Sequence, residues 1–216
     1  DGTPIVVGVQ EWPRGGTLKG DAYGALLEMR HLRLLRPGAG EDGVGLVYSN
    51  ILGEAIEITE CAALAQQTMQ SCLNAANAAS AAGAEPPRID AKTAKGFLST
   101  TARKVLALRF LPPSAAAGHV FLVVHAKEPK SAAAARVLAD FMLELGRQMC
   151  QSREEKLVIM SDTNLGSAAL AEQFAAQLGV GGFMAMPPPA VPTTAKMRSI
   201  LHGQCYDANK CGKLVM

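Results

Sequence analysis

The spacing of the apolar runs in the second half of the chain constrains the fold most strongly. Two apolar runs, Val105–Leu111 and His119–His125, are rich in residues that favour β-strands. The seven residues between them, 112–118, suit a hairpin-like connection. A third run follows at residues 156–160, but here the apolar residues of the intervening segment 131–149 recur with helical spacing. Strands that follow one another directly, together with strands separated by a helix, predict an α/β fold with a largely antiparallel or mixed sheet.

The first half of the chain adds two further predicted strands and one unusual helix. Residues 5–9 (IVVGV) and 44–49 (VGLVYS) are short, β-branched runs that predict strands. Residues 59–84 are rich in Ala, Gln and Asn, which predicts a helix with a weak apolar face. We therefore expect residues 59–101 to be an Ala-rich helical insertion that contributes little to the core.

Length, charge and cysteine usage exclude several classes of protein. A chain of 216 residues suits a single domain over 1–216. Its net charge of +2 excludes a strongly basic nucleic-acid coat protein and an acidic tail. No apolar run reaches the roughly 20 residues of a membrane-spanning helix. Five cysteines without a CxxC spacing argue against a disulfide scaffold or zinc ribbon and predict a reducing, intracellular compartment.

Polar residues that could take part in a reaction follow the apolar runs or end them. Neither a glycine-rich phosphate loop nor a GxSxG elbow occurs, so such strand-end residues are the main candidates for chemistry. Rigid elements hold reacting groups most accurately at positions of this kind. The candidates are Glu11 after the first strand, His125, Asp162 with Asn164, and Lys196 with Arg198 after a proline-rich loop.

Each candidate taken singly has an ordinary structural interpretation. Glu11 suits a solvated strand end, and His125 suits a histidine at a sheet edge. Asp162 and Asn164 suit an Asx turn or a cap for the helix predicted at 167–178. Lys196 and Arg198 suit a surface pair. The functional interpretation therefore depends on the combination.

The combination matches metal-assisted hydrolysis of a phosphoester. Carboxylates from different strand ends suit Mg²⁺, with Mn²⁺ as a substitute, because Mg²⁺ takes one or two carboxylates and keeps several waters. Asn164 and His125 can bind or stabilise phosphate oxygens. Lys196 and Arg198 supply positive charge for an anionic substrate.

The order of these motifs resembles the endonuclease/exonuclease/phosphatase superfamily. The strings VVGVQEWP, DGVGLVYS, VFLVVHAKEPKS, KLVIMSDTNL and PTTAKMRS follow one another as in that superfamily, and the last is most similar to the nocturnin/deadenylase branch. The resemblance implies a deoxyribonuclease I-like, four-layer sandwich of two packed mixed sheets flanked by helices. It also implies a nuclease or nucleotide phosphodiesterase, with nucleic acid or a nucleotide as the phosphate-containing substrate.

The resemblance assigns roles to the candidate residues. It makes Glu11 the Mg²⁺ ligand and His125 a residue of the active site. It gives Asp162 the task of activating or orienting the attacking water. It makes Asn164 a phosphate ligand, and the element containing Lys196 and Arg198 is most similar to the deadenylase branch.

The chain departs from the superfamily pattern at its ends. The first strand and the terminal Ser-Asp-His element are missing, and Gly-Asp-Phe-Asn is replaced by Ser161, Asp162, Thr163 and Asn164. The chain is therefore either a fragment truncated at both ends or a degenerate member. Two alternatives to the hydrolase stay open: a non-catalytic binding or scaffold module of the same fold, and an unrelated α/β protein. We expect little phosphodiesterase activity from these 216 residues alone.

Overall fold

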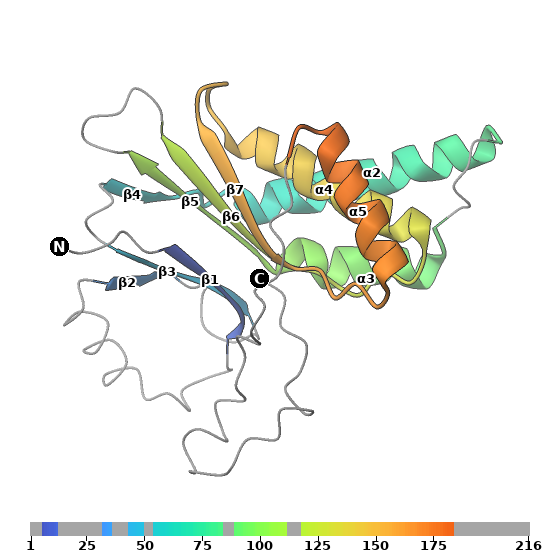
Figure 1. The fold of residues 1–216 in the computed structure, drawn as a ribbon, viewed down its shortest axis with the longest axis horizontal. Helices are drawn as coiled ribbons and strands as arrows, with labels where there is room; N and C mark the ends of the chain where they lie inside the picture. The colour runs from blue at the N-terminus through green and yellow to red at the C-terminus, as the bar shows by residue number, and fades with distance from the viewer. Residues whose placement is uncertain are drawn as a thin grey trace, which may run out of the picture.

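The chain forms layers of sheet, sheet and helix. The computed structural model describes residues 6–12, 32–35, 43–49, 54–83, 89–111 and 118–183. Figure 1 shows a three-stranded sheet on one side of a four-stranded sheet and the helices on the other side. The structure is therefore mixed α/β, as the sequence predicts.

The three-stranded sheet consists of β1 (Val6–Trp12), β2 (Leu32–Leu35) and β3 (Gly43–Ser49) in the order β1-β3-β2. Both strand pairs are antiparallel, so the prediction of two mixed sheets is wrong for these described strands. β1 is also longer than predicted and runs through Gln10 and Glu11 to Trp12. The two polar residues therefore lie within the strand and do not follow it.

The four-stranded sheet is mixed. β4 (Glu54–Glu57), β5 (Val105–Leu111), β6 (His119–His125) and β7 (Lys156–Asp162) lie in that order. The first three are antiparallel, whereas β6 and β7 are parallel and are connected through helix α4 (Ala132–Met149). A parallel pair needs such a crossover, which agrees with the helix predicted from the sequence.

An apolar core holds the two sheets together. Its buried members come from β3, β5 and β6 and are Val44, Leu46, Leu106, Leu108, Phe110 and Val123. The ring of Phe110 makes edge-to-face contacts with Tyr48 at 5.2 Å and with Phe121 at 5.4 Å between centroids. This packing fixes the position of β1 and β3 over β5, β6 and β7.

Gly8 sets how closely β1 approaches the larger sheet. A Cβ atom placed on Gly8 would lie 3.0 Å from Cβ of Met160 and 3.4 Å from Cγ1 of Val123. Gly8→Val should therefore lower the free energy of unfolding by about 1–3 kcal/mol through overpacking, although Val is the better strand former. Urea denaturation measures the change. The control is Val7→Ile at the neighbouring exposed position, and equal stability of both variants would contradict the expectation.

Four helical elements besides α4 cover the other face of the four-stranded sheet: α2 (Cys61–Ala81), α3 (Ala91–Ser99), the 3₁₀ turn η2 (Thr101–Arg103) and α5 (Ala168–Val180). Ser131 caps α4 by accepting a hydrogen bond from the backbone N–H of Ala134 at 3.2 Å. Ser167 caps α5 in the same way, from Leu170 at 3.3 Å. Both helix starts agree with the sequence prediction.

The Ala-rich helix α2 belongs to the core, so the prediction that it contributes little is wrong. It buries Cys61, Ala65, Thr68, Met69 and Leu73. The hydroxyl of Thr68 donates a hydrogen bond to Oε1 of Gln148 on α4 at 3.0 Å. Small side chains let α2 and α4 approach closely, which compensates for the lack of large apolar residues. None of the described helices has the length and apolar character needed to cross a membrane.

Candidate functional site

The site is built on the neighbouring ends of β6 and β7. His125 and Asp162 are the last residues of these strands and are paired in the parallel register. The backbone N–H of Ala126 continues the ladder by donating to the carbonyl of Asp162 at 2.8 Å. Because the strands are parallel, their carboxyl ends share one edge of the sheet, which is where α/β folds commonly bind ligands.

Asn164 ties the two strand ends together. Its backbone N–H donates to Oδ1 of Asp162 at 3.2 Å, which forms an Asx turn. Its side-chain Nδ2 donates to the carbonyl of Ala126 at 3.0 Å. Its φ of 48° lies in the left-handed region, which Asn tolerates better than most residues. The ordinary interpretation of this sequence as an Asx turn is therefore confirmed.

Burial differs sharply across the site. His125 is only 7% exposed, and its backbone N–H donates to the carbonyl of Lys104 at 3.0 Å. Thr163 is also buried, whereas Asp162 is half-buried and Asn164 is exposed. The site therefore has a buried imidazole at its base and a carboxylate and an amide that solvent can reach.

The end of β1 lies at the same side of the molecule. Figure 1 shows β1, β6 and β7 all ending toward the side at which α3 lies. The pairing of β1 with β3 shifts register between Val9 and Trp12, so Gln10 and Glu11 lie at a β-bulge. Bulges are frequent beside active sites because they redirect side chains. The side chain of Glu11 lies outside the described part of the structure.

Two of the predicted phosphate-binding residues fall in the segment 184–216. Lys196 and Arg198 therefore lie outside the described residues. The structure brings together His125, Asp162 and Asn164, and it leads β1, which contains Glu11, to the same side.

The structure adds Thr101 to the surroundings of the site. Thr101 is fully buried, and its hydroxyl accepts a hydrogen bond from the backbone N–H of Lys127 at 2.9 Å. This bond fixes the chain directly after His125 against η2. No sequence pattern points to Thr101, because its partner is 26 positions away.

The side chains of the site decide which metal ion they could hold. Within the described ranges, no three His, Cys, Asp or Glu side chains gather in a metal-binding cluster. Mg²⁺ needs only one or two carboxylates with waters, so the half-exposed Asp162 and the bulge residue Glu11 fit it by donor type.

Burial raises the pKa of Cys61 to about 12 and that of Cys72 to about 11, so these two thiols stay protonated at neutral pH.

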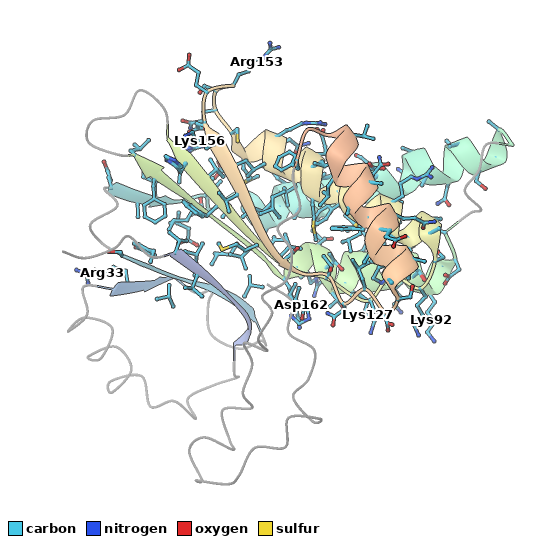
Figure 2. All side chains as sticks on the ribbon, in the orientation of Figure 1. Arg33, Lys92, Lys127, Arg153, Lys156 and Asp162 are labelled. Atoms are coloured by element: carbon cyan, nitrogen blue, oxygen red, sulfur yellow. The ribbon has the colours of Figure 1, made fainter. Side chains whose placement is uncertain are left out.

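A separate pocket lies far from this edge. Its volume is about 670 Å³, and Arg147, Cys150, Arg153 and Leu157 are among its lining residues. Figure 2 shows Arg153 and Lys156 at one end of β7 and Asp162 at the other. The pocket is therefore not part of the strand-end site.

Sequence comparison with known proteins assigns no function to this site. No family model matches the chain, and no curated protein has a significant sequence match to it.

Proposed function

We propose that the chain is a Mg²⁺-dependent phosphodiesterase of the endonuclease/exonuclease/phosphatase type with a deoxyribonuclease I-like fold. Its substrate is nucleic acid or a nucleotide. The observation that carries the proposal is the parallel register of His125 and Asp162, with Asn164 bonded to both strand ends. A reducing, intracellular setting is part of the proposal and rests on the five cysteines without a CxxC spacing.

The side chains divide the work of an in-line hydrolysis. Asp162 orients the attacking water and accepts its proton, because its carboxylate is the solvent-reachable base at the edge. Asn164 keeps one amide hydrogen for a phosphate oxygen, since only the other is needed by Ala126. His125 donates to a second phosphate oxygen and stabilises the charge that develops there.

Glu11 is the residue proposed to hold Mg²⁺, with waters as the further ligands. The ion supplies charge neutralisation at the phosphate oxygens when it is bound. Lys196 and Arg198 are proposed to add positive charge for the substrate, as in the sequence analysis.

A binding or scaffold module is the second candidate, and one observation favours it. Asp162 and Asn164 already make hydrogen bonds that are sufficient to explain their presence as a structural clamp between β6 and β7. In that case the edge holds a partner and no bond is cleaved.

Metal binding tests the proposal. We expect calorimetric titration to show binding of Mg²⁺ and Mn²⁺ in the millimolar range or tighter, and Glu11→Gln to abolish it, because the amide replaces an anionic ligand with a neutral one. Glu57→Gln is the control, since Glu57 is an exposed strand residue on β4, at the opposite edge of the sheet.

Hydrolysis of bis(p-nitrophenyl) phosphate in the presence of Mn²⁺ then separates the two candidates. Turnover that EDTA abolishes supports the hydrolase, and we expect this turnover to be slow in these 216 residues. Metal binding without turnover of this diester or of an oligonucleotide favours the binding module, and absence of metal binding contradicts the metal site.

A further inference from the structure

A cluster of lysines lies beside the candidate site. Lys92 and Lys95 lie on α3, three positions apart and on neighbouring parts of its surface. Lys127 follows β6, and a Cβ atom placed on Gly96 would lie 3.4 Å from Cγ of Lys127, so the stem of Lys127 packs against α3 at Gly96. We call these three residues the cationic ridge.

The cationic ridge is continuous with the strand ends. Ala126 is bonded to Asp162, and the next residue, Lys127, is anchored to Thr101 by its backbone N–H. Figure 2 shows Asp162, Lys127 and Lys92 along one edge of the molecule. A strand bound at Asp162 can therefore extend along α3.

The charge of the ridge has no counter-ion among the residues that the structure describes. Lys92, Lys95 and Lys127 are exposed, and none of them forms an ion pair with a described residue. Around them, residues 89–104 and 126–130 contain six cations and two carboxylates, whereas the whole chain carries a net charge of only +2. One of the two carboxylates, Asp90, is engaged by the backbone N–H and the hydroxyl of Thr93. Like charges held together without partners favour a polyanion.

We propose that the cationic ridge binds the phosphate backbone of single-stranded nucleic acid and leads it to Asp162. That this strand is also the substrate rests on the proposed function. The one aromatic residue of α3, Phe97, is fully buried, so bases have nothing to stack on there. Binding is therefore electrostatic and independent of sequence. A narrow ridge of three cations, two on α3 and one after β6, suits one backbone better than the two of a duplex.

Salt dependence gives the sharpest test. Fluorescence anisotropy of a labelled oligothymidylate, in EDTA to prevent cleavage, is measured at several salt concentrations. Each phosphate contact with a single strand contributes about 0.7 to the slope of log K against log salt, so the triple variant Lys92→Gln/Lys95→Gln/Lys127→Gln should lose about 2 from this slope. Between about 50 and 200 mM salt, the wild-type affinity should then fall roughly twentyfold further than that of the variant.

Two further variants make the outcome decisive. Arg147→Gln/Arg153→Gln/Lys156→Gln removes the same charge from the opposite end of β7 and should keep the wild-type slope. Glu154→Gln, which removes an exposed carboxylate just before that same opposite end, should also keep it. A slope unchanged in the ridge variant, an equal loss in the opposite-end variant, or ridge-dependent binding to phosphatidylserine vesicles without binding to the oligonucleotide would overturn the proposal.

The proposal for binding and the proposal for cleavage can be overturned independently of each other. Hydrolysis of bis(p-nitrophenyl) phosphate without any binding of oligothymidylate would overturn the ridge and leave the proposed function standing. Ridge-dependent binding without hydrolysis of either compound would support the ridge and overturn the function.

Discussion

Replacing Asp162 by Asn is expected to abolish the slow phosphodiester hydrolysis expected of these 216 residues, because loss of a general base typically lowers a rate by about 10²–10⁴-fold. The fold should stay intact, because the Asn oxygen can still accept the hydrogen bond from the backbone N–H of Asn164. The loss should therefore appear in kcat without a large change in the melting temperature. Initial rates with bis(p-nitrophenyl) phosphate and a thermal melt measure the two quantities.

The matched control for Asp162→Asn is Glu154→Gln. Glu154 is an exposed carboxylate just before the opposite end of β7, so its loss changes the net charge equally but leaves the strand-end site intact. Equal rates for wild type and Asp162→Asn would contradict the role of Asp162. Equal losses in both variants would point to net charge as the cause.

Replacing Glu155 by Ala is expected to lower the free energy of unfolding by about 3–5 kcal/mol, because it leaves a buried guanidinium without its counter-ion. Nε of Arg109 on β5 lies 2.8 Å from Oε1 of Glu155, and the two side chains are only 8% and 6% exposed. Nη2 of Arg109 also donates to the carbonyl of Met149 at the end of α4 at 2.6 Å. The pair therefore joins the sheet, α4 and the turn before β7.

Two comparisons make the Glu155 result interpretable by urea denaturation. Glu154→Ala removes the neighbouring exposed carboxylate and should change the stability by less than about 0.5 kcal/mol. The double variant Arg109→Met/Glu155→Leu should recover much of the loss, because no buried charge is left alone. A loss in the double variant as large as in Glu155→Ala would contradict the explanation by an unpaired charge.

The sequence predicts the second half of the fold better than the first. Strands 105–111 and 119–125 are apolar on both faces, and the serines before α4 and α5 mark the helix starts, so local signals suffice there. β4 escapes prediction because its EAIE sequence is short and mostly exposed at a sheet edge. The burial of α2 could not be predicted, because it depends on contact with α4. Thr68 and Gln148, which form a hydrogen bond between the two helices, are 80 positions apart in the sequence.

The candidate site is predictable only in part. The apolar runs locate the end of β6 at His125, but the predicted strand 156–160 stops two residues before the observed end of β7 at Asp162. The helix predicted between the two strands is compatible with a parallel pair, but the register that pairs His125 with Asp162 comes from the structure. The bond from Asn164 to Ala126 spans 38 positions and depends on the left-handed backbone of Asn164, which no periodicity reveals. The anchoring of Lys127 by Thr101 is equally non-local. The family resemblance remains a prediction.

The parallel pairing of β6 and β7 has a consequence for the order of folding. The antiparallel pair β5–β6 is a local hairpin that can form without α4, but the register of His125 against Asp162 requires the crossover 126–155 to close. The entropy of closing such a loop must be offset before its contacts contribute, so parallel pairs form slowly. The strand-end site is therefore assembled late, and a nascent chain acquires it only after α4 has docked on the sheet.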